Sequence, residues 1–137
     1  SDELDAVRFI SALGVGFDLT KRNVQKFLRA NNLPWEISKS FDFSAPVGRL
    51  TPFDPSADVL ERLTFSGFVN GVLRQKGTSS DMIYSIPKLL LEISKYWKLL
   101  KGDLIYTGTP HGVGKLNMGD VLSAVDHRGN TCSWRIG

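Results

Sequence analysis

The asparagine-glycine pair at residues 70 and 71 constrains the fold of this chain more than any other feature. It lies in the middle of LTFSGFVNGVLRQKG, where apolar and polar residues alternate on both sides. Alternation with a period of two is typical of strands that bury one face, and Asn-Gly favours the tight turn of a two-residue hairpin. The sequence therefore predicts two antiparallel strands joined at Asn70-Gly71.

Further strands and helices are predicted on both sides of this hairpin. Short apolar or alternating runs predict strands at 13–17, at 101–108 and on either side of a turn at 128–130. Apolar residues at helical spacing predict helices over 2–13, 21–30 and 78–97. Capping residues precede these helices at Ser1 or Asp2, at Thr20 and at 78–80, and Asn31, Asn32 and Pro34 close the second.

Residues 35–59 read as short β-rich pieces broken by turns, the last of them a loop rich in proline and aspartate. No internal repeat or linker divides the chain. Together, these predicted strands and helices indicate one β-dominated α+β domain over residues 1–137, with helices on one side of a folded sheet.

Composition narrows the class of protein. A 42% share of hydrophobic residues argues against disorder, and the chain contains no run of about 18 apolar residues that would span a membrane. The 17 basic residues are scattered among 14 acidic ones, which disfavours nucleic acid as a partner. A single cysteine, Cys132, excludes a disulfide within the chain and is compatible with a reducing compartment.

The stretch GFDLTKRNVQ places Asp18, Arg22 and Gln25 at steps of four and then three residues. These steps bring side chains onto one face of a helix, where they can converge on one ligand. A solvated helix face is the simpler interpretation of the same spacing.

Two other segments carry candidate functional residues. TGTPHGVGK, residues 107–115, has glycines that let a backbone approach a ligand, but it departs from a phosphate-binding P-loop at Thr109 and Leu116. A connector without a chemical role is the alternative. Lys39 lies in a segment predicted to be extended, where it is either an exposed strand lysine or a positive charge for an anionic substrate.

Taken together, four stretches resemble the fumarylacetoacetate hydrolase superfamily, and within it the small acylpyruvases and oxaloacetate decarboxylases. They are GFDLTKRNVQ, LPWEISKSFDFSAPVG, VNGVLRQKGTSSDMIYSIPKLLLEIS and GDLIYTGTPHGVGKLNMGD, and they occur in the family's order. The resemblance implies a β-rich roll with flanking helices. It also implies a divalent ion, Mg²⁺ or Mn²⁺, held by a Glu-x-Glu pair and by the aspartate that Asp18 matches.

The resemblance further assigns roles to the other candidates. Arg22, Gln25 and Thr109 match substrate-binding residues, and Lys39 matches the catalytic lysine, which also contacts substrate. The implied reaction is hydrolysis or cleavage of a carbon–carbon bond in an acylpyruvate or oxaloacetate, through an enolate that the metal stabilises. A keto-acid substrate, a homodimer, and a mitochondrial or cytoplasmic location without secretion are expected; no nucleic acid or membrane partner is.

The sequence departs from the family pattern at its start. Neither the Glu-x-Glu pair nor the His-Glu pair of the family's N-terminal lid occurs, and the chain begins without methionine inside a helix-like segment. We therefore expect a catalytic domain truncated at its N-terminus. A binding or structural module that lacks the metal ligands is the alternative, and a different substrate or an isomerisation is a third possibility.

Overall fold

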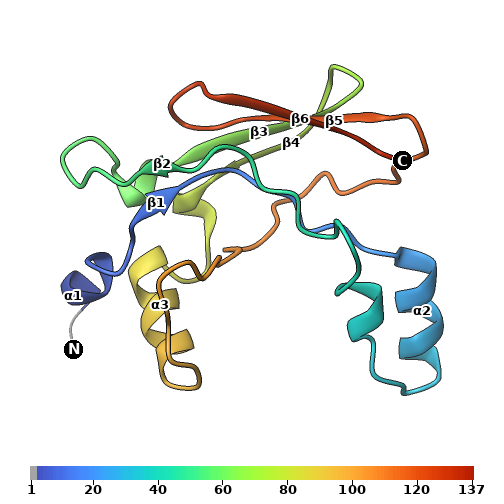
Figure 1. Cartoon of the computed structure of the whole chain (residues 1–137), viewed down its shortest axis with the longest axis horizontal. Helices are drawn as coiled ribbons and strands as arrows, with labels where there is room; N and C mark the ends of the chain where they lie inside the picture. Colours follow the sequence, from blue (N-terminus) through green and yellow to red (C-terminus); the bar gives the residue numbers. More distant parts are fainter. Residues whose placement is uncertain (1–2) are drawn as a thin grey trace.

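The computed structural model describes residues 3–137, apart from the side chain of Leu4, and it contains two antiparallel sheets with helices on one side (Figure 1). The larger sheet has the strand order β4-β3-β5-β6. Its strands are β3 (Thr64–Val69), β4 (Val72–Thr78), β5 (Val121–Val125) and β6 (Thr131–Arg135), and the smaller sheet pairs β1 (Ala12–Leu13) with β2 (Thr51–Pro52). The predicted β-dominated α+β class is confirmed.

Three α-helices and three single 3₁₀ turns accompany the sheets in the described part of the chain. The α-helices are α1 (Glu3–Val7), α2 (Arg22–Ala30) and α3 (Ile86–Ser94), and the 3₁₀ turns are η1 (Glu36–Ser38), η2 (Leu60–Arg62) and η3 (Ser79–Asp81). Ser85 caps α3, because its hydroxyl accepts a hydrogen bond from the Lys88 backbone N–H. The cap predicted at Ser1 or Asp2 lies outside the described residues.

Both predicted hairpins are present. Asn70 and Gly71 have φ values of 51° and 77°, as the turn between β3 and β4 requires. The Asn70 side chain also donates to Asp120 Oδ1 at 2.9 Å and accepts from the Val121 backbone N–H at 2.8 Å. The turn of one hairpin is thereby tied to the first strand of the other.

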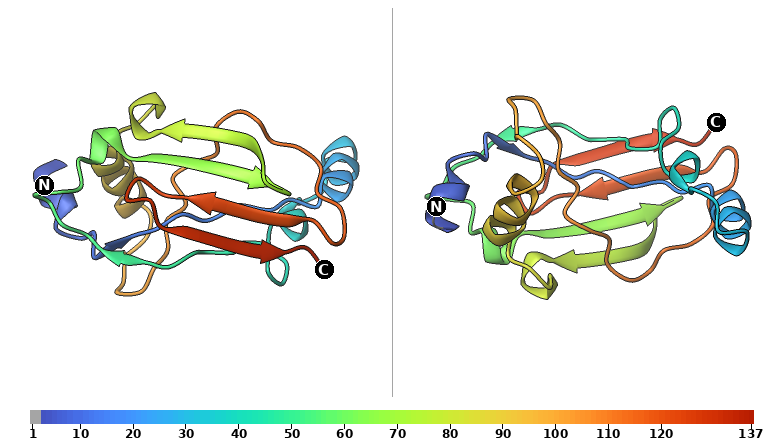
Figure 2. Two further views of the ribbon diagram at one scale, coloured as in Figure 1. Left: turned by 90° about the horizontal axis from the view of Figure 1, so that it is seen from above. Right: turned by 90° about the horizontal axis from the view of Figure 1, so that it is seen from below.

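The core lies where the extended segment after β1 runs along one face of the larger sheet (Figure 2). Phe17 packs edge-on against Trp134 of β6, with ring centroids 5.7 Å apart, and it also lies over Gly67 of β3. A Cβ atom at Gly67 would come within 3.1 Å of the Phe17 ring, so the absence of a side chain there makes room for this contact. Val15, with Leu122 and Ala124 of β5, completes the buried cluster.

A buried carboxylate holds the loop before β3 to the turn of the second hairpin. Asp58 has only 1% of its side chain exposed, and it binds Arg128 through both of its oxygens and His127 Nε2 through Oδ1 at 2.8 Å. The Arg128 hydrogen bond is the main reason that the pKa of Asp58 lies well below its usual range, despite burial, which acts in the opposite direction.

Several predicted elements are wrong in type or extent. The helix expected over 2–13 ends at Val7, the one over 78–97 covers only Ile86–Ser94, and the strand expected at 13–17 contributes only Leu13 to β1 and one bridge at Gly16. Residues 101–108 form no strand, because they cross the face of the sheet as a connector (Figure 2). Instead of a β-rich piece, residues 35–43 contain η1 and turns.

Candidate functional site

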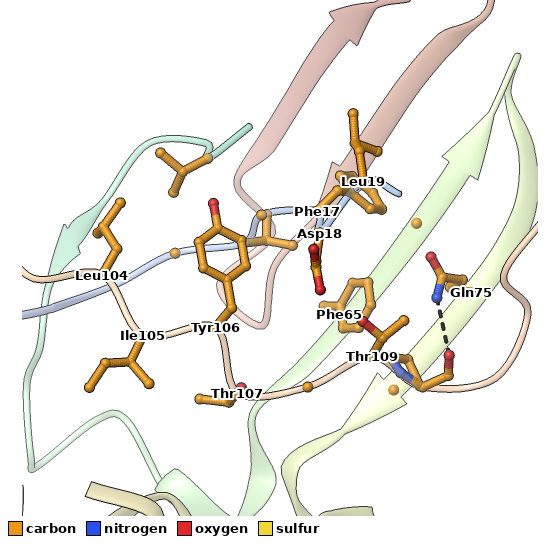
Figure 3. Close-up of a pocket in the computed structure, with 18 of the residues that line it drawn as sticks. Phe17, Asp18, Leu19, Phe65, Gln75, Leu104, Ile105, Tyr106, Thr107 and Thr109 are labelled. Carbon is orange, nitrogen blue, oxygen red and sulfur yellow. Dashed lines mark hydrogen bonds between the residues drawn. The ribbon is translucent and has the colours of Figure 1, made fainter. Parts of the chain in front are cut away.

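A large open pocket lies between the segment after β1, the inner face of β3 and β4, and the connector at 102–116 (Figure 3). Its volume is about 1490 Å³, and its walls mix apolar side chains with a few polar ones. Open pockets with convergent polar groups are where small ligands bind. Three of the predicted site residues, Asp18, Arg22 and Thr109, line it.

Backbone hydrogen bonds on either side of Asp18 orient its side chain away from the core. Phe17 and Leu19 donate backbone hydrogen bonds to Pro46 and Ser44 at 2.9 and 2.8 Å, so the segment is extended here and its side chains alternate between two faces. Phe17 is buried on one face, and the Asp18 carboxylate projects into the pocket with 43% of its side chain exposed. The Asp18 carboxylate is therefore accessible from the pocket.

Lys39 forms an ion pair with Asp18, although 21 positions of sequence separate the two residues. Its Nζ lies 2.6 Å from Asp18 Oδ1 and donates to Thr20 Oγ1 at 2.9 Å, with 28% of the side chain exposed. The segment is not extended as predicted, because Lys39 ends η1 with helical dihedral angles. Ser38 next to it is fully buried, and its carbonyl accepts the Lys21 backbone N–H at 2.9 Å, which brings this turn to the start of α2.

Thr20 is not the predicted cap of α2. Lys21 precedes the helix without a side-chain cap, and the Thr20 hydroxyl is instead the acceptor for Lys39. An extended segment places residues 18 and 20 on the same face, so both can reach one ammonium group. The hydroxyl that the sequence suggested for a helix end thus orients the site lysine.

Arg22 and Gln25 form a second pair on the first turns of α2. Arg22 Nη1 donates to Gln25 Oε1 at 3.1 Å, as neighbours three positions apart on a helix can. Arg22 is exposed and lines the pocket, whereas Gln25 is partly buried and is not a lining residue. Gln25 therefore orients Arg22 in this structure and does not itself line the pocket.

Tyr106 is a pocket residue that the sequence reasoning missed. Its hydroxyl donates to the Ala45 carbonyl at 2.8 Å, and its ring fills the space above Gly16, where a Cβ would lie 2.9 Å from the ring. Burial, and then the nearby charge of Asp18, raise the pKa of the phenol. The sequence signal that could have indicated this contact is a glycine, Gly16, shortly before Asp18 and an aromatic residue, Tyr106, directly before the TGTP loop.

The metal that the resemblance implies needs more ligands than these residues supply. Among residues 3–137, no three His, Cys, Asp or Glu side chains gather in a way that would hold an ion. Asp18 contributes one carboxylate, and Lys39 already occupies one of its oxygens. Since Mg²⁺ is retained through several oxygen ligands, the described residues do not fit a divalent ion by themselves.

Comparison with known proteins gives one family. Residues 2–131 match the family described as fumarylacetoacetate (FAA) hydrolase C-terminal. The chain is 40% identical over 127 residues to oxaloacetate tautomerase YcgM of Escherichia coli, covering 93% of this chain and 58% of that protein. It is 36% identical over 121 residues to a mitochondrial oxaloacetate decarboxylase of Dictyostelium discoideum, covering 88% and 55%.

A solved structure extends the likeness to three dimensions. Fumarylpyruvate hydrolase of Pseudomonas aeruginosa, crystallised with Mn²⁺ and pyruvate, superimposes with a TM-score of 0.90 at 32% identity. The superposition covers 99% of this chain and 58% of that one. The chain thus spans little more than half the length of the relatives it matches.

Proposed function

This chain belongs to the fumarylacetoacetate hydrolase family, and on that premise we propose that it forms part of an enzyme acting on small 2-oxo acids such as oxaloacetate or an acylpyruvate. The observation that carries the proposal is the 2.6 Å contact of Lys39 with Asp18, because Asp18 lines a pocket that Thr109 and Arg22 also line. A guanidinium group and a hydroxyl that line one open space, with an ammonium group bound to a carboxylate of the same space, suit an anionic substrate with more than one oxygen.

The reactions named for the relatives have a common first product. When a 2-oxo acid loses a proton from C3, the electron pair passes into an enolate whose charge lies largely on the C2 oxygen. An enolate of the same kind forms when the bond between C3 and C4 breaks, with C4 leaving as CO₂ from oxaloacetate or, after a water adds to C4, as a carboxylic acid from an acylpyruvate. Proton return to that oxygen completes a tautomerisation, and protonation at C3 completes a cleavage. We propose carbon–carbon cleavage as the reaction, with tautomerisation as the alternative that the name of the bacterial relative favours.

The residues of this chain have separate tasks in that scheme. Lys39, held by Asp18 and Thr20, places its positive charge where the enolate oxygen develops, and preorganised charge of this kind lowers the barrier. Arg22, oriented by Gln25, binds a substrate carboxylate at the rim, and the Thr109 hydroxyl donates to the carboxylate beside the keto group.

A divalent ion, Mg²⁺ or Mn²⁺, fits the proposal only if ligands from outside the described residues join Asp18. Such an ion would polarise the keto oxygen of a bound substrate. We also propose a homodimer in a mitochondrial or cytoplasmic location; the name of the Dictyostelium relative supports the first compartment. Within residues 3–137, the structure has no helix of the length and apolarity needed to cross a membrane.

Turnover by the longest natural form of the protein tests the proposal. Oxaloacetate and acetylpyruvate would be supplied with Mg²⁺ or Mn²⁺, and the enol absorbance and the release of pyruvate would be followed separately. The Asp18→Asn variant is expected to lose at least about 10²-fold in rate, as loss of a key polar group in an active site typically costs. Asp42→Asn is the matched control, because Asp42 is an exposed acid that does not line the pocket. Equal activity in the two variants would refute the role of Asp18.

A binding module without catalysis is the second candidate. It is favoured by the single carboxylate that the described residues bring to the pocket. Mn²⁺ titration followed by electron paramagnetic resonance separates the two, since an enzyme of the proposed kind binds the ion and loses that binding in Asp18→Asn. Pyruvate binding with neither Mn²⁺ binding nor turnover would identify the module.

A further inference from the structure

The connector that carries Thr109 is fastened directly to β4, one of the two edge strands of the larger sheet. Gln75 of β4 donates from Nε2 to the Pro110 carbonyl at 3.2 Å, which Figure 3 shows as a dashed line. Gln75 is partly buried, and it also lines the pocket. A hydrogen bond from a partly buried side chain to a carbonyl fixes the position of that backbone atom better than a solvated contact does.

Glycines bring the two backbones together on either side of this hydrogen bond. A Cβ at Gly112 would lie 1.9 Å from the Arg74 carbonyl oxygen, so only glycine permits the observed approach. A Cβ at Gly77 would meet the Pro110 ring at 3.1 Å. The residues before and after Gln75 along β4 therefore receive the connector at close range, and Gln75 supplies the polar link between these two contacts.

The connector is also fastened on the other side of Thr109. The Tyr106 hydroxyl binds the Ala45 carbonyl, and the Tyr106 ring packs on the segment that carries Asp18. Only residues 107–109 lie between this contact and Pro110, and they include Gly108, whose φ is 120° and where an added Cβ would have no neighbour within 4 Å. The Thr109 hydroxyl thus belongs to a short bridge held at both ends.

We infer that Gln75 is a positioning residue for substrate binding, acting through the Pro110 carbonyl to hold the Thr109 hydroxyl in the pocket. The inference rests on the proposed function, in which Thr109 donates to a substrate carboxylate. Gln75 does not touch the reacting atoms in this scheme. Its loss should weaken substrate binding more than it slows the chemical step.

Gln75→Met in the longest natural form of the protein tests this, because methionine keeps the length of the side chain and removes its donor. The KM for oxaloacetate is expected to rise about 3- to 10-fold, the worth of one hydrogen bond, while kcat changes less than about twofold. Lys76→Met is the matched control, since Lys76 is the exposed neighbour on β4. Thr109→Val and the double variant complete a cycle.

If Gln75 acts through Thr109, adding Gln75→Met to Thr109→Val raises KM little further. Independent, multiplicative effects on KM, or a fall in kcat alone, would overturn the inference. A second measurement does not depend on turnover: amide hydrogen exchange over 107–112 should quicken in Gln75→Met and not in Lys76→Met, with the strands β5 and β6 unchanged. Unchanged exchange there would also overturn it.

These readouts separate the two hypotheses. A wild-type protein that turns over no 2-oxo acid refutes the proposed function, whereas the exchange comparison still decides whether Gln75 holds the bridge. If no 2-oxo acid is turned over, the claim that Gln75 supports substrate binding is refuted together with the function. Only the claim that Gln75 holds residues 107–110 in place is then left to test.

Discussion

The Lys39 ammonium group lies 2.6 Å from the Asp18 carboxylate, although 21 positions of sequence separate the two residues. Neither group is deeply buried, and a pair of this exposure adds little to the stability of a fold. Asp18 and Thr20 line the pocket and Lys39 contacts both, so we propose that this pair serves a ligand.

Replacing Lys39 should therefore affect activity and leave stability almost unchanged. Lys39→Met is expected to reduce kcat/KM by about 10²-fold, because the charge that faces the developing enolate is lost. Lys26→Met is the control, since Lys26 is exposed on α2, whereas Lys39 contacts the pocket residue Asp18. Turnover and the thermal midpoint would be measured together; a fall in the midpoint that matches the loss of activity would mark Lys39 as structural.

Asp58 should behave in the opposite way. Asp58→Ala removes the acceptor of Arg128 and His127 and is expected to lower the free energy of unfolding by about 2–4 kcal/mol. Glu61→Ala, at an exposed acid close in sequence, should change it by less than about 0.5 kcal/mol. Urea unfolding of the natural protein measures both, and equal values would show that the buried carboxylate contributes nothing.

The same carboxylate predicts an acid-sensitive contribution to stability. Because the Arg128 hydrogen bond lowers the pKa of Asp58 in the folded state, its contribution is complete above the unfolded pKa of about 3.9 and is lost as the pH falls below that value. The stability difference between wild type and Asp58→Ala should be full near neutral pH and clearly smaller at about pH 3. A difference that stays constant over this range contradicts the assignment.

Two glycines of the connector provide a matched test of its contact with β4. Gly112→Ala combines a φ of 96° with a Cβ 1.9 Å from the Arg74 carbonyl oxygen, and a strained residue of this kind costs about 1–3 kcal/mol. Gly114→Ala places its Cβ 3.7 Å from Arg74 Nη1, which is ordinary contact. The unfolding midpoint should fall in the first variant only; equal midpoints would mean that the connector moves aside freely.

The parts of the fold that follow from local chemistry could be predicted from sequence. Asn70-Gly71 specifies its turn whatever surrounds it, and Asn31 and Asn32 end α2 as predicted. The alternation in 101–108 was misleading, because Tyr106 packs as a strand residue would while its backbone forms no strand. Local pattern describes which side of a segment is covered, and not what covers it.

In the candidate site, too, contacts between near neighbours in sequence could be predicted and contacts between distant segments could not. Arg22 and Gln25 lie on one helix face, as their spacing predicts, but Asp18, predicted on the same face, lies on the extended segment before α2. The ion pair of Lys39 with Asp18 and the hydrogen bond of Gln75 to Pro110 join segments 21 and 35 residues apart, and no periodicity encodes such contacts. The resemblance to the family made Lys39 a candidate, whereas Gln75 became a candidate only through the structure.

The turn at Asn70 affects the chemical stability of the protein on storage. Asparagine followed by glycine is prone to lose its side-chain amide as ammonia, and it becomes an aspartate or isoaspartate on long storage. At this turn the lost amide is the group that donates to Asp120, so a carboxylate would then face a carboxylate and repel it. Deamidation of Asn70, the residue that most clearly specifies the fold, would thus break the side-chain hydrogen bond that joins the two hairpins.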